Sequence, residues 1–196
     1  MAEERWLIAG LGNPGPAYAG NRHNAGFLVA DALAARAGAR FRASKFRTAA
    51  AQGRLARLPV ILVKPLTFMN ESGRAVAGIS GYYRLPPGRT VVIHDELDLP
   101  FGTVRLKLGG ADSGHNGLRS VTASLGTREY YRVRIGIGRP PGRMDPAAYV
   151  LRDFSAPERK ELPFLVDRAA DAVEMLITDG LAAAQNTFHP ASDPAS

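Results

Sequence analysis

One histidine stands at the junction between a glycine-rich turn and an expected helix. His23 lies between Arg22 and Asn24, and the turn Gly10-Leu11-Gly12-Asn13-Pro14-Gly15 follows the apolar run Trp6-Leu7-Ile8-Ala9. Such a run is typical of a strand buried on both faces. In α/β proteins a strand, a tight turn and a helix place reactive groups at the carboxyl edge of the sheet. We therefore expect His23 to work at that edge, with partners supplied by other strands.

Acidic residues follow a second buried run and could orient His23. Residues 90–93 are mostly apolar, and His94-Asp95-Glu96-Leu97-Asp98 comes next. An aspartate here can accept a hydrogen bond from one ring nitrogen and leave the other nitrogen free as a base. The same residues could instead form a divalent-metal cluster or a solvated acidic turn. Because the chain has no H-E-x-x-H motif and no second His/carboxylate repeat, metal binding is the less favoured chemistry.

Four asparagines lie in expected loops beside strand ends or helix starts: Asn13, Asn24, Asn70 and Asn116. A neutral amide both donates and accepts hydrogen bonds, so a cluster can hold ester or peptide groups and stabilise an oxyanion. The alternative for Asn70 and Asn116 is helix capping. No G-x-S-x-G motif occurs, so a covalent acyl-enzyme is not expected. Hydrolysis by a histidine-activated water fits the residues that are present.

The first turn also matches the dinucleotide-binding pattern G-x-G-x-x-G. Pyrophosphate binding uses free backbone N–H groups, and Pro14 and Pro16 remove two of them. The acidic residue expected about 20 positions further on would be Asp31, which falls inside the expected first helix. A nicotinamide-dependent oxidoreductase is therefore an alternative that rests on the glycines alone.

The composition favours a globular protein with a polyanionic partner. The chain has 196 residues, a net charge of +7 and no cysteine, which excludes disulfides, thiolate metal sites and a cysteine nucleophile. Only 4 of its 25 basic residues are lysines. Arginine suits bidentate phosphate contacts, although a GC-rich genome would give the same bias. No signal pattern opens the chain and no apolar stretch could span a bilayer, so we expect a cytoplasmic protein.

Basic residues alternate with apolar ones on two expected strands. Arg105 and Lys107 lie on the first, and Arg132 and Arg134 lie on the second. On one face of a sheet they would form a phosphate-binding patch, and such a patch alone would also suit a non-catalytic RNA-binding module. The alternative is an ordinary solvated sheet edge.

Periodicity predicts alternating strands and helices, hence a mostly parallel, mixed sheet covered by helices on both faces. We expect one α/β domain over residues 1–189 and a disordered tail over 190–196. The expected strands are 6–9, 48–58, 60–64, 90–93, 103–108 and 131–137. The expected helices are 24–38, 71–83, 118–125, 157–179 and 181–186, with loops at 109–117 and 138–146.

Together these stretches resemble the bacterial-type peptidyl-tRNA hydrolase family. The resemblance rests on GLGNPGPAYAGNRHNAGF at 10–27, KPLTFMNESG at 64–73, HDELDLPFGTVRLKLGG at 94–110, GHNGLRS at 114–120, YRVRIGIGRPPG at 131–142 and AAAQNTFH at 182–189. It covers nearly the whole chain up to about residue 189. The family cuts the ester between a peptide and the ribose of tRNA and so recycles tRNA from aborted translation.

The resemblance implies a role for each matching residue. His23 would be the catalytic base, Asp95 would orient it, and Asn13 would distinguish peptidyl-tRNA from aminoacyl-tRNA. The peptide and the tRNA 3′ end would be lined by Tyr18, Phe68, Asn70 and Asn116, and Asn116 could also hold the attacking water. Lys107 and Arg134 would contact tRNA phosphate, with Arg132 competing for the second position. The family needs no metal or other cofactor and is usually monomeric. Its substrate is tRNA, and neither DNA nor a membrane is an expected partner.

Two loops depart from the family pattern. Gly20-Asn21 replaces a longer residue and threonine, and Ala111-Asp112-Ser113 replaces the commoner run of glycines and histidine. Both departures bear on loop mobility and substrate fit rather than on the chemistry. We further expect residues 138–155 and the final helices to form a lid over the peptide groove.

Overall fold

The computed structural model describes residues 4–189 and confirms the predicted α/β fold as a single domain. The strands are β1 (Trp6–Gly10), β2 (Arg42–Ser44), β3 (Thr48–Leu55), β4 (Leu58–Pro65), β5 (Thr90–Glu96), β6 (Val104–Leu108) and β7 (Tyr131–Gly136). The helices are α1 (Ala25–Arg36), α2 (Ser72–Tyr82), α3 (Asn116–Leu125), α4 (Pro146–Val150), α5 (Ala156–Asp179) and α6 (Leu181–Phe188). Short 3-10 turns are η1 (Arg22–Asn24), η2 (Met69–Glu71) and η3 (Pro87–Arg89). The tail predicted at 190–196 lies outside the described residues.

The seven strands form one sheet in the order β2-β3-β4-β1-β5-β7-β6. The central strands β4, β1, β5 and β7 run parallel to one another. β3 joins β4, β2 joins β3 and β6 joins β7 in antiparallel pairs at the two edges. The sheet is therefore mixed and mostly parallel, and the carboxyl ends of its central strands meet at one edge.

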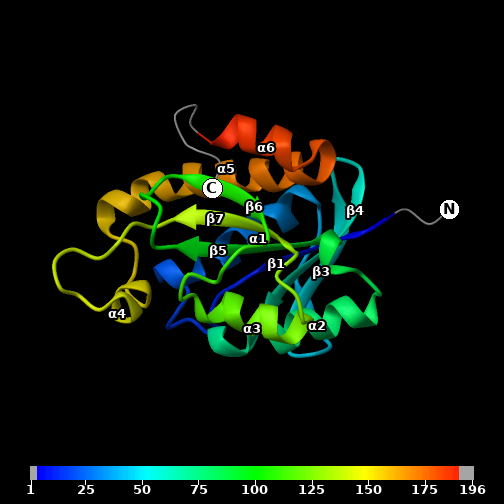
Figure 1. The fold of residues 1–196 in the computed structure, drawn as a ribbon, viewed down its shortest axis with the longest axis horizontal. Coiled ribbons are helices and arrows are strands. Elements are labelled where there is room, and N and C mark those ends of the chain that lie inside the picture. Colours follow the sequence, from blue (N-terminus) through cyan, green and yellow to red (C-terminus); the bar gives the residue numbers. More distant parts are fainter. Residues whose placement is uncertain (1–3, 190–196) are drawn as a thin grey trace.

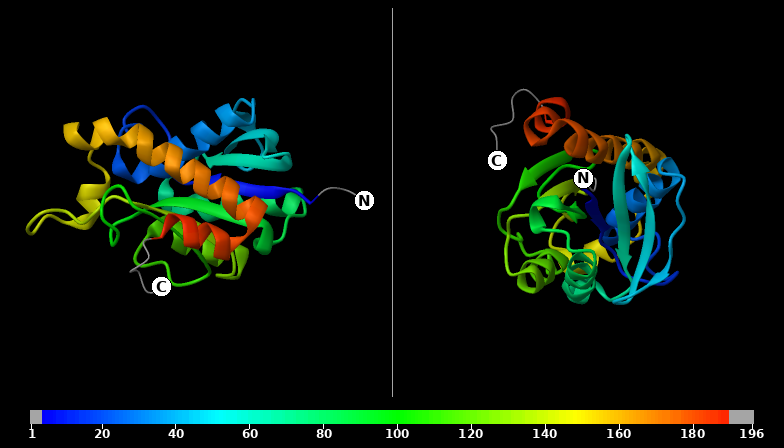
Figure 2. Two further views of the ribbon diagram at one scale, coloured as in Figure 1. Left: turned by 90° about the horizontal axis from the view of Figure 1, so that it is seen from above. Right: turned by 90° about the vertical axis from the view of Figure 1, so that its right-hand side faces the viewer.

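Helices cover both faces of the sheet, as Figures 1 and 2 show. α1, α5 and α6 pack over one face, where the core includes Ile8 and Val133. α2 and α3 pack over the other face, where the core includes Leu7 and Val121. Because side chains alternate along a strand, β1 supplies both cores and every one of its residues is buried. Within residues 4–189, no helix is long and apolar enough to cross a membrane.

Strand β5 continues three residues beyond the predicted 90–93. His94, Asp95 and Glu96 pair with β7 and are at most 8% exposed. The sequence predicts a turn here because polar residues normally end a buried strand. The parallel pairing with β7 instead carries these polar groups into the interior, where they need partners.

The remaining differences concern short elements. β2 was not predicted because it has three residues, all exposed. α4 was also missed, because it has five residues and follows the proline-rich loop that the sequence predicts at 138–146. α3 begins at Asn116 instead of residue 118, since the side chain of His115 caps it.

Helix α1 lies unusually close to β1, and this contact fixes the turn that carries His23. A Cβ atom on Gly26 would lie 2.6 Å from the backbone nitrogen of Leu11 and would also meet the carbonyl oxygen of Ile93. Only glycine allows this approach of backbone to backbone.

We expect Gly26→Ala to lower the free energy of unfolding by about 1–3 kcal/mol, the usual cost of overpacking. Urea denaturation measures it. The matched control is Gly81→Ala in α2, where an added Cβ would meet no atom within 4 Å. It should be neutral or stabilising by about 0.5–1 kcal/mol. Equal urea midpoints for wild type and Gly26→Ala would show that the contact does not constrain the turn.

Candidate active site

A pocket of about 500 Å³ opens at the carboxyl edge of the central strands. Its wall contains Asn13 from the turn after β1, His23 from η1 and Asp95 from β5. The β4–α2 connection, the start of α3 and α4 supply the other walls; their residues include Phe68, Met69, Asn70, His115, Asn116, Pro146, Val150 and Leu151. Six of the nine predicted site residues therefore line one pocket, and Tyr18, Lys107 and Arg134 do not.

Asp95 and His23 are joined by hydrogen bonds. Nδ1 of His23 lies 2.8 Å and 3.0 Å from the two carboxylate oxygens of Asp95. An ionised carboxylate only accepts hydrogen bonds, so Nδ1 carries the proton and donates it. Nε2 of His23 makes no hydrogen bond within residues 4–189. Because His23 lines the pocket, this nitrogen is left with a lone pair for a substrate or a water.

A second histidine, His115, binds the same carboxylate and is not among the site residues predicted from the sequence. Its Nε2 donates to Oδ1 of Asp95 at 2.8 Å. Its Nδ1 accepts the backbone N–H groups of Gly117 and Leu118 at 3.1 Å and 3.2 Å. These bonds fix the ring as the Nε2–H tautomer. The sequence signal was present, because His115 directly precedes Asn116 where a glycine-rich loop meets a helix.

The charges of this cluster shift the pKa of its members. Burial raises the pKa of Asp95, but His23 and His115 lower it by more, so that it lies well below its usual range. Burial lowers the pKa of His23, but the charge and the hydrogen bonds of Asp95 raise it by more, so that the net shift is upward. Burial, with His115 close by, holds the pKa of His94 well below its usual value. The ionised Asp95 therefore accepts hydrogen bonds from both rings, and His23 is the ring whose basicity is raised.

The three side chains His23, Asp95 and His115 could in principle surround a metal ion, since their ligand atoms lie within 4.8 Å of one another. A metal ligand needs a free lone pair. Nε2 of His115 carries a proton, and its Nδ1 already accepts two backbone N–H groups. The predicted alternative with His94 and Asp98 is not favoured either, because Nε2 of His94 is buried and Asp98 pairs with Arg139.

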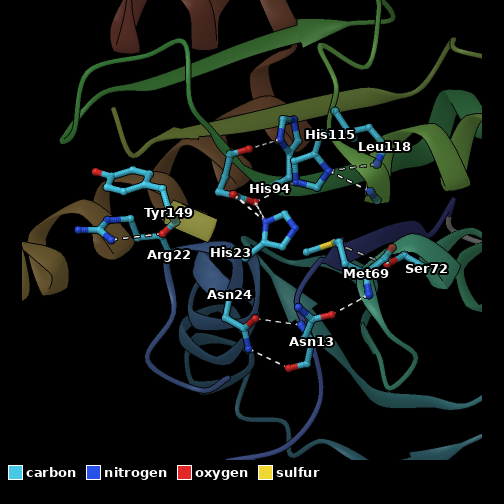
Figure 3. Close-up of polar contacts among 12 residues, drawn as sticks. Asn13, Arg22, His23, Asn24, Met69, Ser72, His94, His115, Leu118 and Tyr149 are labelled. Carbon is cyan, nitrogen blue, oxygen red and sulfur yellow. Dashed lines mark hydrogen bonds and ion pairs between the residues drawn. The ribbon is translucent and has the colours of Figure 1, made fainter. Parts of the chain in front are cut away.

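Asn13 is held rigidly beside His23. Its backbone N–H donates to Oδ1 of Asn24, and Nδ2 of Asn24 donates back to the backbone oxygen of Asn13, both at 2.9 Å (Figure 3). Its side-chain oxygen accepts the backbone N–H of Met69 at 2.7 Å. These contacts leave the amide Nδ2 of Asn13 as a donor with no partner within residues 4–189.

Asn70 and Asn116 line the same pocket, and neither caps a helix through its side chain. The N-cap of α3 is His115, and the N-cap of α2 is Glu71, which makes no side-chain capping bond. The capping alternative is therefore wrong for both asparagines. Their exposed amides stand at the pocket wall and can bind a ligand.

The two predicted aromatic residues are neighbours. The rings of Tyr18 and Phe68 meet edge to face with centroids 6.4 Å apart. Phe68 lines the pocket and is 55% exposed, whereas Tyr18 does not line it. A large exposed ring at a pocket entrance is suited to apolar or stacking contacts with a ligand.

The four basic residues of β6 and β7 share one face of the sheet but differ in environment. The register pairs Arg105 with Arg134 and Lys107 with Arg132. Arg132 is fully buried and donates to the backbone oxygens of Gly110 and Ala111. Lys107 is partly exposed, and its pKa is lowered by burial and by the nearby Arg134 and Arg132. Arg132 thus holds the loop before α3, and Lys107 is the more accessible cation of this pair.

The dinucleotide alternative fails on geometry. Asp31, which would have to bind a ribose, instead pairs with Lys64 at 2.6 Å. The helix that follows the glycine turn begins only at residue 25, so the turn is not a helix N-terminus. A Cβ on Gly12 would meet the ring of Phe27, which shows that this glycine serves internal packing.

A family model described as peptidyl-tRNA hydrolase matches residues 7–195. The chain belongs to the peptidyl-tRNA hydrolase family. Family members hydrolyse peptidyl-tRNA, so the predicted enzyme class and reaction are confirmed.

The similar proteins include close bacterial relatives. A peptidyl-tRNA hydrolase from Frankia alni is 62% identical over 184 residues, which are 94% of this chain and 93% of the relative. One from Mycolicibacterium smegmatis is 58% identical over 187 residues, or 95% and 98% of the two chains. The crystal structure of the Acinetobacter baumannii enzyme covers 100% of both chains with 35% identity and a TM-score of 0.89.

The two parts of the predicted lid lie differently relative to the pocket within the described residues. Asp145, Pro146, Ala147, Val150 and Leu151 line the pocket, so the segment 138–155 does supply a wall. No residue of α5 or α6 lines it. These helices pack against α1, β6 and β7. Placing the final helices over the pocket was therefore wrong.

Titration of the histidine rings by NMR tests the charge arrangement. We expect the pKa of His23 to lie above its ordinary value of about 6.5 and that of His94 to lie well below it. In Asp95→Asn the carboxylate charge is lost while burial remains, so the pKa of His23 should fall. A His23 ring that titrates identically in the two proteins would show that Asp95 does not control it.

Proposed function

We propose that His23 is the general base that activates water in peptidyl-tRNA hydrolysis. The observation that carries this proposal is the hydrogen bond from Nδ1 of His23 to Asp95, which leaves Nε2 facing the pocket. Nε2 takes a proton as the water oxygen attacks the ester carbonyl. The tetrahedral intermediate then collapses, the ribose oxygen leaves, and the protonated ring returns the proton to it. Asp95 stabilises the transient imidazolium and stays ionised.

The amides around His23 supply the neutral contacts that the substrate needs. Asn13 offers its amide nitrogen as a donor, because its oxygen is held by the backbone N–H of Met69. A peptide carbonyl can accept that bond, whereas the ammonium group of a free aminoacyl-tRNA is itself a donor. Asn13 therefore supports selection of peptidyl-tRNA and stabilisation of the oxyanion. Asn116 holds the attacking water, and Asn70, Phe68 and Tyr18 line the peptide and the tRNA 3′ end.

Lys107 and Arg134 are the proposed contacts to tRNA phosphate. Both arginines are buried, but Arg132 is the poorer candidate, because it is 0% exposed against 8% for Arg134 and its guanidinium is bound to the backbone oxygens of Gly110 and Ala111. We further propose that residues 1–189 form the catalytic domain and that the enzyme works as a cytoplasmic monomer. The tRNA substrate, a component of translation, supports the location.

A comparison of two substrates tests the proposed function. Purified protein is incubated with an N-acetylated aminoacyl-tRNA and with its unblocked counterpart, each with and without a chelator. The proposal expects release of free tRNA from the blocked substrate only, at the same rate in chelator. Release from both substrates at equal rates, or from neither, would overturn it, and loss of activity in chelator would point to a metal.

His23→Ala should lower kcat by at least about 10²–10⁴-fold, the range that a general base contributes. The dissociation constant for the blocked substrate should stay within about twofold, because the proposed tRNA contacts lie elsewhere. Single-turnover kinetics and a binding titration measure the two quantities. Near wild-type turnover in this variant would mean that another group is the base.

Lys107→Ala should weaken binding of tRNA and reduce the slope of log K against log salt concentration by about 1. The matched control is Lys160→Ala, because Lys160 is exposed on α5 away from the pocket. It should leave the slope unchanged. If both variants keep the wild-type slope, β6 does not contact the tRNA backbone.

A further inference from the structure

Arg22 precedes the catalytic histidine and is buried, yet it has no place in the chemistry proposed above. It is 7% exposed and belongs to the same 3-10 turn as His23. Its side chain extends toward Tyr149 of α4 (Figure 3) and Glu158 of α5, and Arg22 does not line the pocket. A buried arginine needs partners, and those of Arg22 come from both of these helices.

The first partner is Tyr149 in α4. The guanidinium carbon lies 4.0 Å from the centroid of the Tyr149 ring, which is a close cation–π contact. Nη1 also donates to the backbone oxygen of Tyr149 at 3.4 Å. The hydroxyl of Tyr149 in turn donates to the backbone oxygen of Ile137, just after β7, at 3.3 Å. Arg22 therefore contacts α4 through both the ring and the backbone of one residue.

The second partner is Glu158 in the first turn of α5. Nη2 donates to Oε1 of Glu158 at 2.8 Å, and both side chains are largely buried. The same oxygen accepts the backbone N–H of Ser155, which completes the capping box of α5. Burial raises the pKa of Glu158, but these bonds lower it by more, so the group is ionised at neutral pH.

Backbone contacts also connect the turn that carries His23 to the residues that follow α4. Residue 21 forms a β-bridge with residue 153, and Nδ2 of Asn21 donates to Oδ1 of Asp153 at 2.8 Å. The backbone N–H of Arg22 donates to the oxygen of Arg152 at 3.0 Å. The unusual Gly20-Asn21 pair noted in the sequence thus helps to join the turn of His23 to residues 152–154.

We propose that Arg22 is a positioning residue that fixes α4 to the catalytic turn, so that the pocket wall and the base form one unit. This inference rests on the active site proposed above. α4 has only five residues, too few to be stable alone, and it supplies Pro146 and Val150 to the pocket wall. Without Arg22 the wall would lose its fixed distance from His23, and the substrate would be held less accurately.

Two arginine variants test the proposal in the full-length protein. Arg22→Met removes the contacts to Tyr149 and Glu158 but keeps most of the side-chain volume. The matched control is Arg36→Met: Arg36 of α1 also pairs with α5, through Asp167, Asp171 and Glu174, and does not line the pocket. Turnover of N-acetylated aminoacyl-tRNA gives kcat and KM, and hydrogen exchange reports on the amides of 145–154.

Arg22→Met should lower kcat/KM about tenfold and speed exchange in 145–154. Arg36→Met should keep kcat/KM within about twofold, with unchanged exchange in that segment. Arg22→Lys, which retains the charge but not the planar fork, should fall between wild type and Arg22→Met.

The proposal is overturned if Arg22→Met keeps its kcat/KM, if Arg36→Met loses as much, or if exchange in 145–154 does not respond. Should Arg22→Met not fold, Glu158→Gln applies the same criteria, because glutamine keeps the bond to Ser155 and removes the ion pair. Wild-type turnover in the same assay separates the two claims. Its absence would overturn the proposed function, whereas equal wild-type and variant rates would overturn the role of Arg22 alone.

Discussion

The structure depends on one buried carboxylate that accepts hydrogen bonds from two imidazoles. Asp95 is 2% exposed and accepts hydrogen bonds from Nδ1 of His23 and Nε2 of His115, each at 2.8 Å. A charge at this depth is costly unless it is paired. The two rings offset that cost, and in return the carboxylate fixes which nitrogen of each ring carries the proton. The free Nε2 of His23 follows from this arrangement and is the basis of the proposed chemistry.

The fold brings these groups together at one edge of the sheet. Parallel pairing puts the ends of β1 and β5 side by side, so the turn that carries Asn13 and the strand that carries Asp95 share an edge. The close approach of α1 at Gly26 fixes the position of the His23 turn relative to that edge. Capping of α3 by His115 joins a helix to the same carboxylate. Arg22, on the far side of the turn, connects it to the wall that α4 supplies.

The sequence predicted the reactive groups better than it predicted their supports. His23 and Asp95 could be recognised because each follows a short apolar strand, where a parallel sheet gathers polar groups. The burial of Arg132 could not be predicted, because the alternation of residues along a strand shows which face a side chain lies on but not what covers that face. His115 was missed since a cap that uses a ring nitrogen is rare among helix signals. The extension of β5 depends on its pairing with β7, and α4 packs through Tyr149 against Arg22, contacts that no local pattern reveals.

Neutron diffraction of a deuterated crystal near pH 8 tests the central claim most directly, because it locates the protons. The account predicts deuterium on Nδ1 of His23 and on Nε2 of His115, none on Asp95, and a bare Nε2 on His23. Deuterium on a carboxylate oxygen of Asp95, or on Nε2 instead of Nδ1 of His23, would contradict it. In the first case Asp95 would not be the charged acceptor that orients both rings, and in the second His23 would lack the lone pair with which it is proposed to activate water.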